Sequence, residues 1–159
     1  MKIAVTGEPP ADISLARRAV QAAVRPYRLP RGSAVTIAFV DDDEMRALNR
    51  RYRKKDSTTD VLSFGESWPR GTKGHDAAML LAPGPEGVVR LGDIVISGAQ
   101  AARQAKRRKW PLASELAFLA AHGALHLLGF DDETRSGHRE MLALGRAAVT
   151  TARQDSVKR

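Results

Sequence analysis

The segment A-H-G-A-L-H-L-L-G-F-D-D, residues 121–132, places two histidines in an otherwise apolar run that a glycine and two aspartates then interrupt. Apolar residues occupy nearly every side of a helix drawn from Pro111 to Leu128, and proline is well tolerated at such a first position. Gly129 suits the left-handed conformation in which many helices end. The sequence therefore predicts a buried helix that stops just before two carboxylates.

The flanking sequence predicts four strands, several more helices and one long loop. β-rich runs mark the strands, at residues 2–6, 34–40, 60–64 and 91–97. Helical spacing, caps and breakers mark the helices, at residues 13–24, 41–52, 98–109 and about 136–152, the last followed by a basic tail. A stretch rich in glycine and proline, residues 66–87, predicts a surface loop. Because strands are followed by a cluster of helices, we expect an α+β fold: a single small mixed sheet of about four strands with helices packed on it.

Composition limits the class of protein. The chain has 159 residues, and we expect residues 1–159 to form one domain. It has no cysteine, which excludes disulfides, thiolate metal ligands and cysteine catalysis. The formal charge of +8 favours a polyanionic partner, either nucleic acid or an anionic membrane surface, although a basic surface also serves solubility. The absence of cysteine is compatible with a cytoplasmic location. We expect no signal peptide and no membrane-spanning segment, because the first residues resemble a strand and no run of about 18 apolar residues appears.

The two histidines of the buried helix have the spacing of metal ligands. His122 and His126 are four residues apart, so both imidazoles lie on one helix face and can bind one ion. A catalytic zinc site needs a third protein ligand and an open position for water. Because the chain turns back after Gly129, Asp131 or Asp132 can supply a carboxylate, and the set His122, His126 and Asp132 is favoured. The alternative is a pair of core histidines satisfied by hydrogen bonds, but burying imidazoles without partners is costly. We therefore expect a metal site at the end of the buried helix.

Three segments, in the same order along the chain, resemble the YbeY family of bacterial endoribonucleases and rRNA maturation factors. The family signature H-G-x-L-H-L-x-G-[YF]-D-H is matched from His122 to Asp131. The family pattern L-N-x-x-Y-R-x-K-D-x-x-T-[DN]-V-L-S-F is similar to residues 48–64, and L-G-D-I-x-I-S is similar to residues 91–97. The resemblance covers most of residues 40–132 and is therefore specific.

The resemblance implies a metal-dependent endoribonuclease that acts on single-stranded RNA, in 16S rRNA 3′-end maturation and ribosome biogenesis. It implies a precursor of the small ribosomal subunit RNA as substrate, ribosome-assembly proteins as partners, and Zn²⁺ or another divalent ion as cofactor. Arg53 matches the arginine that the family uses at its active site, where it would hold the charge that develops on phosphate oxygens. The basic residues around it, within 50–55, would steer the RNA backbone.

One departure from the family pattern concerns the metal site. The third histidine of the signature is replaced by Asp132. Three histidines leave a bound divalent ion with its full charge of about +2, whereas one carboxylate lowers this to about +1, so bound water becomes less acidic. His138 is an alternative third ligand from the next helix. Asp131 belongs to the matched signature and is expected to fix the turn or to orient a ligand.

Several other residues are candidates for supporting or RNA-binding roles. Lys55 and Asp56 match the family pattern, and we expect an ion pair that shapes their loop. Glu115 is expected to be an exposed residue of the first helical turn, with a supporting contact to the histidines as the alternative. Trp68 is the candidate for stacking on an RNA base, and the cluster at residues 106–109 either binds rRNA phosphates or is a solvated helix end.

Two other classes of function remain open from the sequence. A metal-dependent hydrolase of another substrate would have the same ligands, although a zinc peptidase of the H-E-x-x-H type is disfavoured because Gly123 occupies the position of its general base. The other class is a non-catalytic ribosome-binding factor in which the metal only stabilises the fold.

Overall fold

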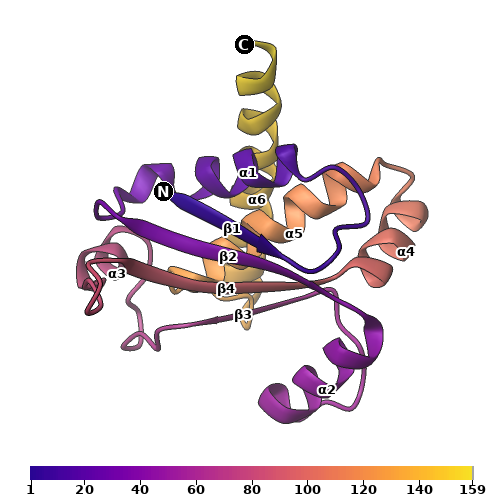
Figure 1. Cartoon of the computed structure of the whole chain (residues 1–159), viewed down its shortest axis with the longest axis horizontal. Coiled ribbons are helices and arrows are strands. Elements are labelled where there is room, and N and C mark those ends of the chain that lie inside the picture. Colours follow the sequence, from indigo (N-terminus) through magenta and orange to yellow (C-terminus); the bar gives the residue numbers. More distant parts are fainter. Residues whose placement is uncertain (159) are drawn as a thin grey trace.

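The computed structural model describes residues 1–158 and contains one four-stranded sheet with helices against it (Figure 1). Along the chain the elements are β1 (Lys2–Thr6), α1 (Ser14–Val24), the short 3-10 helix η1 (Arg25–Tyr27), β2 (Ser33–Val40), α2 (Asp42–Arg53), β3 (Val61–Gly65), α3 (His75–Leu80), β4 (Val89–Ser97), α4 (Gly98–Arg108), α5 (Leu112–Leu127) and α6 (Arg135–Val157). The four strands and the α+β class agree with the prediction. No helix among residues 1–158 has both the length and the apolar character needed to cross a membrane.

The sheet is mixed, as expected. Its strand order is β1-β2-β4-β3, with β1 and β2 parallel, β2 and β4 parallel, and β3 antiparallel to β4. Strict alternation of buried and half-buried residues along β2 shows why this segment is a strand: one side of it faces the core. The sheet therefore has one apolar face and one more polar face.

The apolar face carries the helical layer. Helix α5 contacts β3, β4, α1, α4 and α6, and almost all of its residues are buried, as its all-round apolar sequence predicted. Close packing on the sheet depends on Gly123, where a Cβ would lie 2.6 Å from Ile94 Cγ2. Because glycine has no Cβ, the histidine end of α5 packs directly on β4 and β3.

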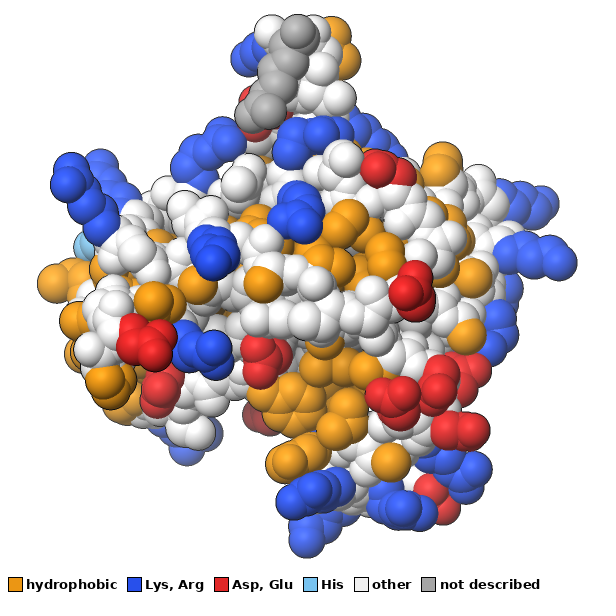
Figure 2. Space-filling view, viewed as in Figure 1, with side chains coloured by type: hydrophobic (Ala, Val, Ile, Leu, Met, Phe, Trp, Pro, Cys, Tyr) orange, Lys and Arg blue, Asp and Glu red, His pale blue; other side chains and the backbone are white. Residues whose placement is uncertain are grey.

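Helix α2 lies on the opposite face of the sheet. Its Met45 packs with Leu62 and Val95 in a second, smaller apolar cluster. Asp41 caps the helix by accepting a hydrogen bond from the Glu44 amide, and acidic residues fill the first turn while arginines fill the last. Figure 2 shows the resulting separation, with acidic side chains gathered at the start of α2 and basic ones at its end. The basic end of α2 faces the region of the histidines.

Two segments differ from the predictions. The stretch 66–87 is not loop throughout, because it contains α3, whose Ala77 and Ala78 are buried; six residues are too few to show a helical period in the sequence. Helix α6 continues to Val157 instead of giving way to a tail at Ala152. No glycine or proline interrupts these final turns, and contacts at Arg153 and Asp155 anchor them.

Candidate metal centre

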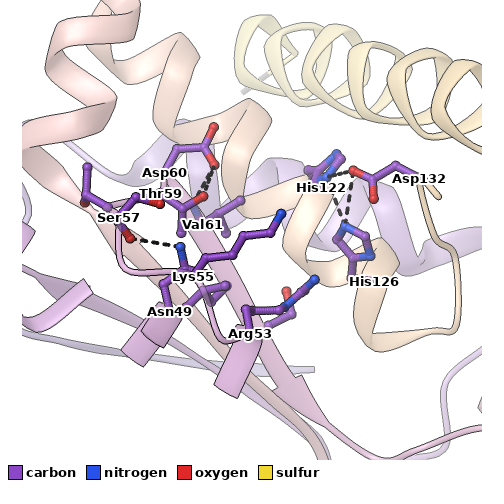
Figure 3. A pocket seen from close by; sticks show the side chains of 13 residues that line it. Asn49, Arg53, Lys55, Ser57, Thr59, Asp60, Val61, His122, His126 and Asp132 are labelled. Atoms are coloured by element: carbon purple, nitrogen blue, oxygen red, sulfur yellow. Dashed lines mark hydrogen bonds and ion pairs between the residues drawn. The ribbon is translucent and has the colours of Figure 1, made fainter. Parts of the chain in front are cut away.

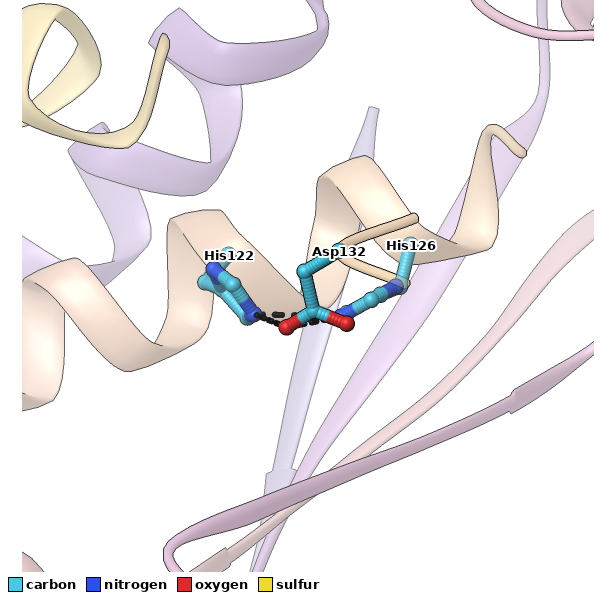
Figure 4. Close-up of side chains that lie close together, drawn as sticks. All are labelled: His122, His126 and Asp132. Atoms are coloured by element: carbon cyan, nitrogen blue, oxygen red, sulfur yellow. Dashed lines mark hydrogen bonds and ion pairs between the residues drawn. The ribbon is translucent and has the colours of Figure 1, made fainter. Parts of the chain in front are cut away.

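The end of α5 brings three potential ligands together. Beyond the last helical turn, Gly129 has a φ of +84°, and a Cβ there would collide with the carbonyl oxygen of Thr72, so the predicted glycine stop is confirmed. The turn that follows returns Asp132 to the helix face that carries His122 and His126, as Figure 4 shows. One ligand atom from each of the three residues lies within 4.8 Å of the others.

The spacing of these atoms suits a tetrahedral metal ion. His122 Nε2 and His126 Nε2 are 3.1 Å apart, and the Asp132 Oδ2 atom lies 3.6 Å from the first and 3.9 Å from the second. Bonds of about 2.0–2.1 Å at tetrahedral angles would separate ligand atoms by about 3.4 Å. Two imidazoles and one carboxylate also leave the fourth position open, which is the arrangement of catalytic rather than structural zinc sites.

The ring of His126 is oriented by the backbone. Its Nδ1 atom lies 2.9 Å from the carbonyl oxygen of Phe130, which can only accept a hydrogen bond. Nδ1 therefore carries the hydrogen, and in the neutral ring the lone pair of Nε2 points toward His122 and Asp132. This is the state in which an imidazole binds a metal.

Burial favours the neutral form of His122. Its side chain is 14% exposed, and desolvation, followed by the proximity of His126, lowers the pKa of this imidazole below its ordinary value. Its Nδ1 atom is buried without a hydrogen-bond partner among residues 1–158, so Nε2 makes all of its polar contacts. A buried ring that interacts only through the atom facing its two neighbours fits a metal ligand.

The positions of His138 and Asp131, the two alternative third ligands, distinguish them from Asp132. His138 does not belong to the ligand group, and lines a different cavity on α6. Asp131 Oδ1 accepts a hydrogen bond from the Glu133 amide at 3.2 Å, so this carboxylate fixes the turn, one of the two roles expected of it. Asp132 is therefore the carboxylate that the fold presents to the histidines.

A pocket of about 380 Å³ opens beside the three ligands. Arg53, at the end of α2, lines it together with Lys55, and both side chains extend into the pocket in Figure 3. Arg53 makes no hydrogen bond or ion pair with another residue of the described part of the chain, so its guanidinium is available to a ligand. The structure thus brings the predicted arginine and the predicted metal ligands to one cavity.

The loop between α2 and β3 is shaped by residues that the sequence did not single out. Asn49 is buried, and its side-chain amide donates a hydrogen bond to the Ser57 carbonyl at 2.9 Å. The expected Lys55–Asp56 pair is wrong, because the Asp56 carboxylate binds Arg46 across the loop at 2.8 Å. Lys55 therefore has no ion pair with Asp56, and its side chain lines the pocket. Asn49 matches a fixed position of the family pattern over residues 48–64, which is the signal that could have singled it out.

One further expectation was wrong for reasons of packing. Glu115 is fully buried rather than exposed, and its carboxylate accepts hydrogen bonds from Trp110 Nε1 at 2.7 Å and from Arg108, not from a histidine. Burial raises the pKa of this carboxyl above its ordinary value, against the opposite effect of those two donors. Trp68 is half-buried, its Nε1 donates to the Leu127 carbonyl and its ring packs on the core, and base stacking by this residue stays a prediction.

The fold and the site together define a small α+β protein with a candidate metal centre of the open, hydrolytic kind. The model of the family Endoribonuclease YbeY matches residues 8–153. The chain therefore belongs to this family, as its motifs predicted.

Individual relatives agree with this assignment. The chain is 43% identical over 131 residues to the protein named Endoribonuclease YbeY from Moorella thermoacetica, covering 82% of this chain and 80% of that one. It is 42% identical over 123 residues to the protein of the same name from Chloroflexus aurantiacus, covering 77% and 75%. The solution structure of TM1509 from Thermotoga maritima shares the fold with a TM-score of 0.58 at 20% identity, over 99% of this chain and 95% of that one.

Proposed function

We propose that this chain is a metal-dependent endoribonuclease that cleaves single-stranded RNA and takes part in rRNA processing. The observation that carries the proposal is the shared cavity. Three potential ligand atoms line it, together with the Arg53 guanidinium, which has no partner within residues 1–158. Relatives named Endoribonuclease YbeY support the choice of RNA as substrate.

We assign His122, His126 and Asp132 as the metal ligands and Arg53 as the catalytic residue. A bound ion would supply Lewis acidity toward the phosphate and a water of lowered pKa. Arg53 binds the non-bridging phosphate oxygens and stabilises the charge that develops on them during cleavage. Lys55 adds positive charge that holds the neighbouring backbone in the cavity.

We further propose zinc as the ion, because two imidazoles and one carboxylate in a tetrahedral arrangement suit it well. The family resemblance extends the proposal to a substrate in the precursor of the small-subunit rRNA, to ribosome-assembly proteins as partners and to the cytoplasm as location. We also propose that residues 1–159 form one hydrolase domain.

A panel of substrates tests this proposal against the two other classes. The purified protein, with zinc supplied and then removed by EDTA, is incubated with single-stranded RNA, a peptide and an ester. We expect cleavage of the RNA alone, lost with EDTA and regained with zinc. Cleavage of the peptide or ester instead indicates a hydrolase of another substrate. If nothing is cleaved while EDTA lowers the melting temperature, the metal has a structural role and the protein is a binding factor.

A further inference from the structure

A second cavity, of about 450 Å³, lies next to the metal centre between the end of α4, the first half of α5 and α6. None of its lining residues is shared with the pocket of Arg53. Phe118 connects it to the metal centre, because the centroid of its ring is 6.0 Å from that of the His122 imidazole. A chain bound at the ligands therefore reaches this cavity within a short distance.

The charge in this cavity is of one sign. Its lining includes two guanidinium groups, from Arg108 and Arg146, and the imidazole of His138, and it includes no carboxylate. Arg146 and His138 are exposed and make no side-chain hydrogen bond or ion pair with another residue of the range 1–158. His138 and Arg146, eight residues apart on α6, thus both line this cavity with polar groups that have no side-chain partner among residues 1–158.

The opposite wall is a rigid aromatic surface. Trp110 is held in place by the bond from its Nε1 to the buried Glu115 carboxylate, and Arg108 is held by the same carboxylate at 3.2 Å. The Arg108 guanidinium lies over the rings of Trp110 and Phe118, at 5.9 and 6.0 Å from their centroids, while half of its side chain stays exposed. Glu115 therefore supports both the Trp110 ring and the half-exposed Arg108 guanidinium, which has five N–H donors.

A fixed ring beside two guanidinium groups matches the chemistry of a nucleotide. Bases of single-stranded RNA stack on aromatic side chains and on arginine planes, and arginine binds phosphate bidentately. We propose that this cavity binds the base and phosphate of a nucleotide next to the cleaved bond, so that the RNA lies across the metal centre from Arg53 to Arg146. The inference rests on the proposed endoribonuclease function and adds a binding subsite to it.

Arg146 allows a test that leaves the fold intact, because it is exposed and its side chain has no partner among residues 1–158. Binding of a fluorescein-labelled single-stranded RNA of twelve nucleotides is measured by anisotropy in EDTA, where no metal is bound, over a series of salt concentrations. The matched control is Arg139→Ala, which removes the same charge from the same helix but does not line the cavity. We expect Arg146→Ala to weaken binding about fivefold at 0.1 M salt and to reduce the salt slope by about 0.7, the effect of one lost phosphate contact. Arg139→Ala should leave both unchanged.

A second readout tests stacking separately from charge. The chain has two tryptophans, so Trp68→Phe leaves Trp110 as the sole source of tryptophan fluorescence. Circular dichroism first verifies that this variant is folded. Titration with the same RNA, without its label, should quench Trp110 in this variant and quench it less when Arg146→Ala is added.

The outcomes separate the subsite from the proposed function. If Arg146→Ala binds as tightly as Arg139→Ala and Trp110 is not quenched, while the wild type still cleaves RNA, the subsite is wrong and the proposed function stands. If the wild type neither binds nor cleaves the RNA, the proposed function fails and the subsite fails with it. Weaker binding of Arg146→Ala alone, together with quenching, supports the subsite.

Discussion

The Nδ1 atom of His126 lies 2.9 Å from the carbonyl oxygen of Phe130, four residues further along the chain. Phe130 belongs to the turn that ends α5 and delivers Asp132 to the two histidines. The same turn therefore sets the tautomer of one proposed ligand and the position of another. A substitution in this turn should therefore alter the candidate metal centre even when the three proposed ligands are unchanged.

Replacement of the carboxylate tests the proposed ligand set first. We expect the wild type, purified without chelator, to carry about one zinc per chain and Asp132→Ala to carry much less, because two imidazoles alone bind zinc weakly. Metal content is measured by mass spectrometry of the purified proteins. The control is Glu133→Ala, which removes the adjacent exposed carboxylate and should retain the metal. Equal zinc in both variants would exclude Asp132 as a ligand.

Asp132→His tests the electrostatic effect of the carboxylate. A third neutral ligand leaves the ion with a charge of about +2 instead of about +1, so bound water ionises at lower pH. We expect the rising limb of the pH dependence of RNA cleavage to move to lower pH in this variant. The profile of kcat/KM against pH, with zinc saturating, gives the comparison. An unchanged limb, or one moved to higher pH, would contradict the role assigned to the carboxylate charge.

Arg53→Ala tests transition-state stabilisation. The guanidinium has no partner in the described part of the chain, so its removal should not affect folding, whereas the loss of a donor to the developing charge should lower kcat by about a hundredfold. Single-turnover cleavage of the RNA measures this effect. Arg51→Ala, from the same turn of α2 but outside the pocket, removes only charge that steers RNA, and with the enzyme saturating the RNA it should cleave at the wild-type rate. A similar rate for both variants would remove Arg53 from the site.

The buried Glu115 carboxyl predicts a pH dependence of stability. Because its pKa is raised in the folded protein, the folded state retains this proton at a pH where the unfolded chain has lost it. The stability that the carboxyl contributes is therefore fully present below its ordinary pKa of 4.5 and is lost as pH rises through the folded value. The free energy of unfolding of the wild type minus that of Glu115→Gln should decrease over this interval. Urea unfolding at several pH values measures it, with Glu133→Gln as the exposed control; an increase would contradict the prediction.

Gly123→Ala tests the packing that places the histidines over the sheet. A Cβ at 2.6 Å from Ile94 Cγ2 forces the helix and sheet apart, at a cost of about 1–3 kcal/mol. This cost is at least as large as the ~1 kcal/mol of stability that alanine gains over glycine within a helix. We expect a net loss of stability in urea unfolding. Gly84→Ala, where the nearest atom would be 3.6 Å away, should be nearly neutral, and a stabilised Gly123→Ala would contradict the packing argument.

The sequence by itself determined the elements whose patterns are local. A largely apolar sequence defines α5, and Gly129 ends it because glycine readily adopts the positive φ found there. The four-residue spacing of His122 and His126 places them on one face of any helix, whatever surrounds it. The proposed histidine ligands and the family were therefore accessible without a structure.

Tertiary structure decided which side chains become partners and which become buried. Asp56 binds Arg46 rather than its neighbour, and Glu115 is buried because Trp110 and Arg108 close over it. The short helix α3 exists because its alanines pack on the core, although six residues cannot show a helical period. Spacing along the chain records which side chains share a face, whereas the partner of a side chain is set by the packing of whole elements, which only the folded protein specifies.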